Sequence, residues 1–476
     1  MQRYGLSATA LIWSLALTPV AAWAQDPMLL VDNDGFQLRG HFQAGVNGVI
    51  EQNLFWNYAD TIAPAANFNS DTQWLEGYIK PGISFSKKFN DAVTAYGKAS
   101  LVASGTLGTD SYDASNTGAI TLEEGYIGLR TSGSGATFDI SVGPREFKAG
   151  TGMLLANGGT SGFDRGALKL GPRKAWGQAV LASVKIEDFT GTAFFLDPNE
   201  LPDSDSGTKI VGADLRYDAE GGDFAGATLG HVLESSAPYP KAAPGGIGVP
   251  SVEPGAREGL NFVSLYGRTN PLKDNLPGLY IGGDFAYEWN ERIDMQAWGG
   301  RAQIGYTFAD MPWTPTIGYA YQTFSGDDPN TSRQERFDPL FFEGSPSSWS
   351  TGSKSSMVFI NSNVNAHQFS LKLMPSERDT ITLRYSHISA NELLSPVQFG
   401  QGTRIDVSSG VPNPVGGVTN AHLSDDFFIE YGRVLTPNAF LTAGLGMSFP
   451  GAGIDSVTTE KSPIWSGGFV NVVFNF

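Results

Sequence analysis

Histidine, serine and acidic side chains are the residues with which this sequence could perform catalysis or bind a metal ion. The five histidines are spread along the chain, at His41, His231, His367, His387 and His422. None has the H-E-x-x-H spacing that sets two imidazoles on one helix face as zinc ligands. The chain has no cysteine and no G-x-S-x-G nucleophile elbow. We therefore expect no catalytic residue, no metal site and no cofactor.

One adjacency, Ser386-His387, keeps a hydrolase open as an alternative. A hydrolase built on strands can take its serine, histidine and acid from neighbouring strands. By the period-two pattern, however, His387 shares the apolar face of its segment with Leu383 and Tyr385. The competing interpretation is a single polar side chain near a membrane interface, and release of fatty acid or peptide would distinguish the two.

Arginine and lysine side chains form the second pattern with a possible function. The candidates to attract an anionic solute are Arg39, Arg130, Arg145, Arg165, Arg173, Lys174, Arg216, Arg268, Arg301 and Arg384. Most lie on the polar phase of alternating segments, where acids such as Glu76, Glu124 and Asp284 also lie. Two interpretations follow: these cations guide anions through a pore, or they pair with the carboxylates and stabilise the wall.

The elements that must position these side chains are strands with one apolar and one polar face. From Phe36 to Ile50, one phase is apolar or small, while the other carries residues such as Gln37, Arg39 and Gln43. Eighteen such segments are predicted, near 36–50, 72–88, 91–107, 118–131, 136–146, 174–186, 188–197, 207–219, 223–235, 258–271, 278–290, 295–309, 313–324, 364–375, 379–392, 423–435, 438–449 and 464–476.

The connections between these segments are of two kinds. Long ones, at 51–71, 146–173, 235–257, 324–363 and 392–422, alternate with tight turns such as 220–223 and 375–378. Long extracellular loops and short periplasmic turns are typical of a transmembrane, antiparallel, up-and-down β-barrel. We expect an all-β barrel over residues 25–476, with the loops at 146–173 and 324–363 narrowing a water-filled lumen.

The two ends of the sequence agree with export to an outer membrane. Arg3, the apolar stretch 6–20 and Ala22-Trp23-Ala24 predict a signal peptide over residues 1–24, cleaved before Gln25. The last segment alternates and stops on Phe476, a pattern typical of the clients of barrel-assembly machinery. Beyond the signal peptide, no run reaches the roughly 20 apolar residues of a spanning helix.

The overall charge of the chain limits the kinds of molecule that it can bind. The formal net charge is −17, so a nucleic acid partner is not expected. Because the polar strand phase leans basic, the excess acid must lie in loops and turns, such as 197–205. The expected partners are outer-membrane lipid and lipopolysaccharide, the assembly machinery and a small polar or anionic solute; the oligomeric state stays open.

Two stretches resemble motifs of the alginate-export family of 18-stranded outer-membrane porins. The first runs from Gly143-Pro144-Arg145 through Arg165 to Arg173-Lys174-Ala175-Trp176. The second, more specific stretch is a Gly-Asp-Asp-Pro loop leading to Phe-Asp-Pro-Leu-Phe, with the candidate residues Asp327, Asp328, Arg336, Phe337 and Asp338.

The resemblance implies a pore for passive diffusion, with a basic constriction to which Arg145, Arg165, Arg173 and Lys174 would contribute. Beyond 165–174 this chain has no dense arginine cluster, so it departs from a pore for alginate itself. We expect a channel for polar, anionic or carbohydrate-like solutes and not an enzyme. The alternatives are a barrel hydrolase of phospholipase or protease type and a structural or adhesive barrel.

Overall fold

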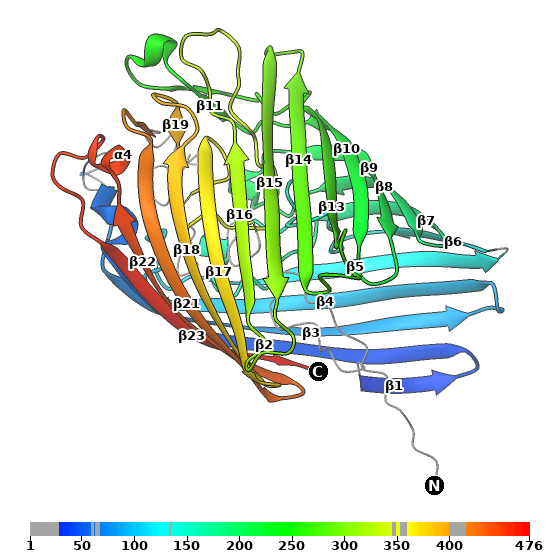
Figure 1. Ribbon diagram of the computed structural model, residues 1–476. Helices are drawn as coiled ribbons and strands as arrows, with labels where there is room; N and C mark the ends of the chain where they lie inside the picture. Colours follow the sequence, from blue (N-terminus) through cyan, green and yellow to red (C-terminus); the bar gives the residue numbers. More distant parts are fainter. Residues whose placement is uncertain are drawn as a thin grey trace.

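The main sheet closes on itself because its last strand pairs with its second. The computed structural model describes residues 28–476, apart from 59–60, 62–66, 134, 161, 345–348, 353–358 and 399–415. The predicted signal peptide, 1–24, lies outside the described residues. Of the 19 strands in the main sheet, all but β1 form a ring in which each strand is antiparallel to the next along the chain. β23 then pairs with β2, from Gln43↔Asn475 to Gln52↔Ser466, and seals the barrel (Figure 1).

The predicted segments become strands with nearly the expected limits, so the predicted 18-stranded up-and-down barrel is confirmed. The wall consists of β2 (Phe36–Gln52), β3 (Thr72–Lys88), β4 (Val93–Gly108), β5 (Gly118–Gly133), β6 (Ala136–Val142), β7 (Gln178–Ile186), β8 (Phe189–Asp197), β9 (Lys209–Asp218), β10 (Phe224–Glu234), β13 (Asn261–Thr269), β14 (Leu279–Asn290), β15 (Met295–Thr307), β16 (Thr316–Phe324), β17 (Val364–Ser376), β18 (Asp379–Ala390), β21 (His422–Thr436), β22 (Ala439–Pro450) and β23 (Trp465–Asn475).

Apolar side chains cover the outside of this wall, as the alternation predicts. Ile50, Leu75 and Leu229 are 52%, 48% and 59% exposed, whereas the inward residues Asn47 and Glu76 are each 1% exposed. In a soluble protein such an apolar outer surface would be unstable, but around a closed barrel it matches the hydrocarbon of a bilayer. The outer face of the wall is therefore suited to lipid hydrocarbon and the inner face to water, as the sequence predicts.

Two features of the wall were not predicted. A short strand, β1 (Met28–Asn33), pairs with the start of β2 through a tight turn. Asp34 and Gly35 of that turn have φ values of 45° and 72°, which an Asp-Gly pair adopts readily. In addition, β6 ends at residue 142 and β7 begins at 178, because the chain between them leaves the wall.

A bulge in β5 changes which acids face the lumen. Leu122 pairs with Leu101 and Glu124 with Ser100, so Glu123 is an extra residue in β5. Glu123 and Glu124 are consecutive, yet both are buried on the lumen side, at 0% and 4% exposure. A bulge re-aims a side chain in this way, so strict alternation misplaces Glu123.

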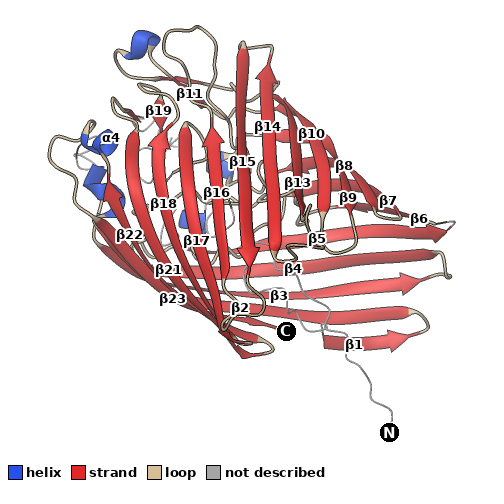
Figure 2. Cartoon of the chain, viewed as in Figure 1, coloured by secondary structure: helices blue, strands red, loops and turns tan. Residues whose placement is uncertain are grey.

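The long connections gather at one end of the barrel, where Figure 1 shows β11 (Tyr239–Lys241), β19 (Pro396–Val397) and α4 (Ala452–Asp455). β11 pairs with β12 (Ser251–Glu253), and β19 pairs with β20 (Gly416–Gly417). The helices are single turns, η2 (Leu54–Asn57), α2 (Gly162–Arg165), η4 (Pro202–Ser204), η5 (Pro244–Gly246) and α4 (Figure 2). Within the described residues, no helix is long and apolar enough to cross a membrane.

The main apolar core is made by these loops inside the barrel. Trp56, Leu155, Trp176, Phe337 and Trp349 are each at most 1% exposed and belong to one buried cluster. Side-chain N–H groups tie the cluster to backbone: the indole of Trp349 donates to the carbonyl of Thr151 at 3.0 Å, and that of Trp176 to Phe147 at 2.9 Å. The half of the lumen nearest the long loops is therefore packed with protein.

Candidate pore

The other half of the lumen holds a cavity of about 1480 Å³ that reaches the short turns. Its lining includes the turns at 220–223, 309–310, 377–378 and 436–437, together with inward residues of the wall. At its inner end it meets the loop 169–174. If the short turns are periplasmic, this cavity is a vestibule open to the periplasm.

Charge in the vestibule is opposite to that of the whole chain. Among the residues that the structure describes, ten basic ones line it: Lys80, Lys169, Lys174, Arg268, Lys273, Arg301, Lys372, Arg378, Arg384 and Arg433. Its six acidic lining residues are Glu146, Glu220, Asp223, Asp310, Glu377 and Glu430. A chain with a formal charge of −17 thus surrounds this space with an excess of four positive charges. Walls of low dielectric constant focus such a potential into the cavity.

The loop 143–177 closes the inner end of the vestibule, and two wall carboxylates hold its backbone. Glu76 on β3 accepts hydrogen bonds from the N–H groups of Lys169 at 3.2 Å and Leu170 at 2.8 Å. Glu123, the bulge residue, accepts from the N–H groups of Lys174 at 2.8 Å and Ala175 at 3.1 Å. Buried N–H groups need such acceptors. These carboxylates therefore position the loop as well as the charges on it.

Replacing Glu76 by alanine is expected to release this loop. The N–H groups of two residues would lose their acceptor, at a cost of about 1–3 kcal/mol each. We expect trypsin to cleave after Lys169 or Arg173 at least about thirtyfold faster, since cleavage follows the population of the opened loop. The control is Glu124→Ala, which removes the partner of Lys98 (2.6 Å) on the same wall. Equal cleavage rates in both variants would show that Glu76 is not the anchor.

Four of the ten predicted cationic residues line the vestibule: Lys174, Arg268, Arg301 and Arg384. The guanidinium of Arg268 lies 4.2 Å from the ring centroid of Tyr280. That of Arg301 lies 3.9 Å from the ring centroid of Trp349 and 3.2 Å from Asp284. These contacts fix the position of both charges within the wall.

The other six lie outside the residues that line the cavity. Arg39 donates to Gln37 at 3.4 Å, Arg130 pairs with Asp139 at 2.8 Å and Arg216 with Asp218 at 2.7 Å, all in strands. Arg145 lies 4.5 Å from the ring centroid of Tyr126.

Arg165 and Arg173 are buried within the loop that closes the vestibule, at 3% and 5% exposure. Arg165 donates to the carbonyl of Glu200 at 3.0 Å, and Arg173 donates to the hydroxyl groups of Thr121 and Ser104, each at 2.8 Å. These guanidinium groups hold the loop in place through carbonyl and hydroxyl oxygens, and neither lines the vestibule.

The Gly-Asp-Asp-Pro loop joins the long loops to one another through hydrogen bonds. Asp327 accepts hydrogen bonds from the N–H groups of Ala242 at 2.7 Å and Glu335 at 2.8 Å. Burial raises the pKa of its carboxyl group. The carboxylate of Asp328 accepts a local hydrogen bond from the N–H group of Asn330 at 2.9 Å.

The residues after this turn are buried more deeply. Phe337 is fully buried against Phe324, with ring centroids 5.4 Å apart. Arg336 is 1% exposed, donates to Gln398 at 2.7 Å and lies 5.2 Å from the ring centroid of Tyr239. The motif thus joins the loops that carry β11 and β19.

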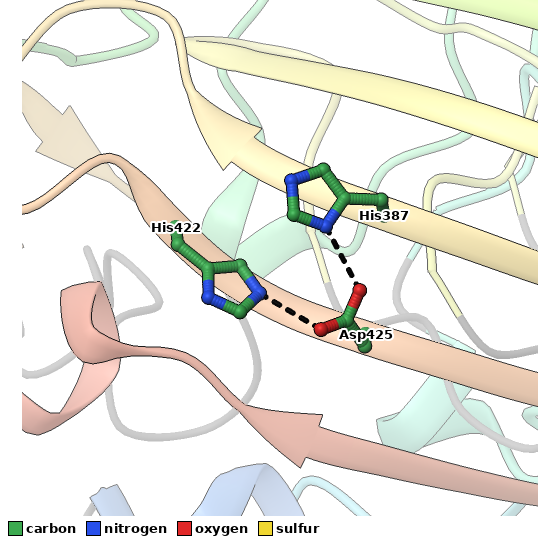
Figure 3. A group of neighbouring side chains, drawn as sticks. All are labelled: His387, His422 and Asp425. Atoms are coloured by element: carbon green, nitrogen blue, oxygen red, sulfur yellow. Dashed lines mark hydrogen bonds and ion pairs between the residues drawn. The ribbon is translucent and has the colours of Figure 1, made fainter.

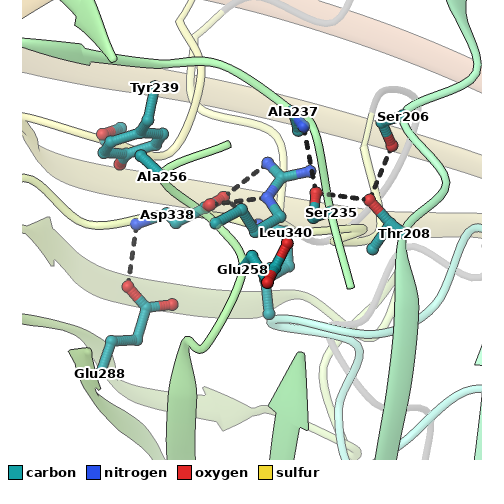
Figure 4. A network of polar contacts seen from close by, with 12 residues as sticks. Ser206, Thr208, Ser235, Ala237, Tyr239, Ala256, Glu258, Glu288, Asp338 and Leu340 are labelled. Carbon is teal, nitrogen blue, oxygen red and sulfur yellow. Dashed lines mark hydrogen bonds and ion pairs between the residues drawn. The ribbon is translucent and has the colours of Figure 1, made fainter. Parts of the chain in front are cut away.

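Asp338 is the centre of the network in Figure 4. Its carboxylate accepts two parallel hydrogen bonds from Arg257, at 2.7 and 2.8 Å, and its own N–H donates to Glu288 on β14 at 2.9 Å. Two effects act on the pKa of Arg257: burial of its side chain lowers the pKa, and the charge of the Asp338 carboxylate raises it. The effect of Asp338 is the larger, so the pKa lies above its ordinary value. This bidentate pair connects the motif loop to the wall.

Sequence reasoning missed Lys169, Lys273, Arg378 and Arg433 as lining residues. Lys169 lies in the loop 143–177, and its charge reaches the cavity only because that loop folds inward. Lys273 and Arg378 lie in short turns, where the sequence predicts solvated residues. Arg433 lies on the outward phase of β21. For Lys273 and Arg378, the basic residues in the short turns were the available signal.

Ser386 and His387 do not form a catalytic pair in this structure. Ser386 is 1% exposed on the lumen side, whereas His387 faces outward and contacts Asp425 at 2.8 Å. Adjacent residues of a regular strand point to opposite faces. The outward position of His387 agrees with its predicted place on the apolar phase.

Comparison with known proteins agrees with the family resemblance. The alginate export family model matches residues 265–401. Among curated proteins, none matches this chain. Solved structures that are similar include OccK2 (OpdF) of Pseudomonas aeruginosa, with 11% identity, 92% of this chain and 97% of that chain covered and a TM-score of 0.49. OccK5 (OpdH) of the same organism has 10% identity, coverages of 92% and 98% and a TM-score of 0.48. OmpT of Vibrio cholerae has 9% identity, coverages of 94% and 99% and a TM-score of 0.41.

The closed barrel, its apolar outer face and its charged vestibule define an outer-membrane β-barrel channel of a bacterium. The match to the alginate export family model over residues 265–401 agrees with the resemblance predicted from the motif loop. The matched residues include the motif loop and the strands from β13 to β18, which contribute Arg268, Arg301, Lys372 and Arg384 to the vestibule.

Proposed function

We propose that this channel conducts anionic, polar solutes, including acidic carbohydrates, by passive diffusion. The observation that supports it is the vestibule, where ten basic residues face six acidic ones in a chain that is strongly acidic overall. The lining also includes aromatic side chains, among them Tyr280, Tyr306 and Phe469. Selectivity would come from the width and charge of the lumen.

Because the long loops fill half of the lumen, a solute must pass the loop 143–177 to cross the barrel. Opening of this loop would therefore control conductance. We expect a small basal conductance in planar bilayers and a preference for anions when the two sides hold different salt concentrations. Anionic oligosaccharides added on the short-turn side should block the current at lower concentration than neutral oligosaccharides of equal length. Cation preference, or equal block by both, would contradict the proposal.

We further propose that the barrel is not a hydrolase. The candidate pair Ser386-His387 is divided between the two faces of β18, which supports this view. Purified protein should release neither fatty acid from phospholipid nor peptide from denatured protein above the level of the Ser386→Ala variant. Activity that depends on Ser386 would favour the hydrolase alternative.

The remaining alternative is a structural or adhesive barrel. Such a barrel would conduct no ions even in the Glu76→Ala variant, in which the loop 143–177 is released.

Export and assembly are proposed from the two ends of the chain. Cleavage before Gln25 is testable by N-terminal sequencing of the protein from outer membranes. Phe476 exchanges backbone hydrogen bonds with Phe42, at 2.8 and 3.0 Å, where the barrel closes. We propose that assembly machinery recognises this terminal strand, and that the acidic loops meet lipopolysaccharide through divalent cations.

A further inference from the structure

We propose that His387, His422 and Asp425 form a binding site for a divalent transition-metal ion, with Zn²⁺ as the best match, on the outer face of the barrel. Figure 3 shows the three side chains converging from two neighbouring strands, β18 and β21. Asp425 lies between the imidazoles: its Oδ1 is 2.8 Å from His387 Nδ1, and its Oδ2 is 3.0 Å from His422 Nε2.

The geometry is close to what one metal ion requires. One ligand atom from each residue lies within 4.8 Å of the others. Zinc binds nitrogen and oxygen ligands at about 2.0–2.2 Å, so ligand atoms on one ion lie roughly 3–4 Å apart. Small rotations of the two rings would therefore bring all three onto a shared ion, which would replace the hydrogen bonds to Asp425.

A backbone irregularity brings these residues together. In a regular strand, His422 and Asp425 would point to opposite faces, because they are three residues apart. The register shifts between Ile388 and Ser389, which pair with Ser424 and His422, so β21 holds an extra residue. This bulge turns His422 outward beside Asp425. Bulges are frequent where a binding site needs a re-aimed side chain.

The chemistry of the donors selects the metal. Two imidazoles and one carboxylate suit Zn²⁺ and its neighbours in the first transition row and are poor ligands for Ca²⁺ or Mg²⁺. Three protein ligands leave a coordination position for water or another oxygen ligand. All three residues are half-buried, so an ion can reach the site from outside.

The site lies at the base of a long loop. His387 is near the end of β18 and His422 begins β21, and the connection between the two strands runs through residues 391–421. β18 and β21 already pair at this point, with Ser389 opposite His422, and a metal ion would add a second link between the two strands. Because the ion would bind the folded state and not the unfolded chain, binding should stabilise the folded barrel.

The test uses the full-length mature barrel in detergent, purified without a polyhistidine tag and treated with chelator. Co²⁺, followed by its visible absorption, and Zn²⁺, followed by competition with Co²⁺, should bind one site per chain. We expect His387→Ala and His422→Ala each to weaken Co²⁺ binding by more than about tenfold, since each removes a ligand. The matched control is His367→Ala, because His367 pairs with His387 in the adjacent strand and on the same outer face, with rings 6.5 Å apart.

Each outcome decides the proposal. Retained affinity in His367→Ala, together with loss in the two other variants, supports it. No Co²⁺ binding by the unmodified barrel would overturn it, and so would equal affinity in all four proteins. The change in gel mobility between unheated and heated protein establishes that each variant is folded. Asp425→Asn supplies a second test, because it removes the carboxylate and keeps the size of the side chain.

Discussion

Exchange of Lys174, Lys273 and Lys372 for glutamate is expected to turn the pore from anion-preferring to cation-preferring. All three line the vestibule, which has ten basic and six acidic residues. The triple variant would have seven basic and nine acidic residues, so the sign of the local potential would reverse. Lys174 and Lys273 are exposed and Lys372 is half-buried, and the backbone N–H of Lys174 keeps its bond to Glu123.

The measurement is the reversal potential of single channels between unequal salt concentrations. The control variant replaces Lys88, Lys185 and Lys461 by glutamate, because these exposed lysines lie outside the vestibule lining. It changes the charge of the chain equally and should leave the preference for anions intact. A similar shift in both variants would mean that overall charge, and not the vestibule, sets selectivity. High salt should reduce the difference between the variants, because it screens charges.

The second large effect is expected for Asp338→Asn in the motif loop. The substitution leaves Arg257 without its carboxylate partner, and the exposed fraction of the Arg257 side chain is 16%. Breaking a buried ion pair costs about 3–5 kcal/mol; because Arg257 keeps some contact with solvent, we expect about 3 kcal/mol. Local opening of the loop should then be roughly a hundredfold more frequent.

Hydrogen exchange of peptides covering 325–344 and 239–260 measures that opening. Asp328→Asn is the matched control, since Asp328 lies in the same motif and contacts Asn330 at the turn. It should leave exchange in the second region unchanged. Slow exchange in Asp338→Asn would mean that the apolar cluster around Phe337 holds the loop without the ion pair. The conductance of the same variant would then show whether this ion pair also keeps the pore narrow.

The sequence predicted the wall well because a membrane barrel obeys a simple local constraint. Each strand has one face toward hydrocarbon and one toward water. The apolar side chain of Leu75 therefore predicts an outward position, and the charged side chain of Glu76 predicts an inward one. The lengths of the connections distinguish the two ends of the barrel, because tight turns lie at one end and long loops at the other. For that reason the count of 18 strands and their limits were predictable, even without any knowledge of contacts across the sheet.

The use of the inward charges was much less predictable. Alternation places Arg130 and Arg268 on the same face, yet Arg130 pairs with Asp139 and Arg268 lines the vestibule. Neighbouring strands determine that difference, because an inward charge is paired or available according to what lies opposite. Arg173 is a clearer case: its basic motif indicated a constriction, but the loop buries it as an anchor.

By itself, then, the sequence determined the barrel, its two faces and the identity of the motif loop, since these depend on residue types at short, regular spacings. Only the tertiary structure decided which loops fill the lumen, which cations reach the vestibule, and that His387, His422 and Asp425 meet. Those features depend on bulges at Glu123 and before Ser424 and on hydrogen bonds between distant segments. A single extra residue in one strand reverses the direction of a side chain, and no periodic pattern in the sequence marks where that occurs.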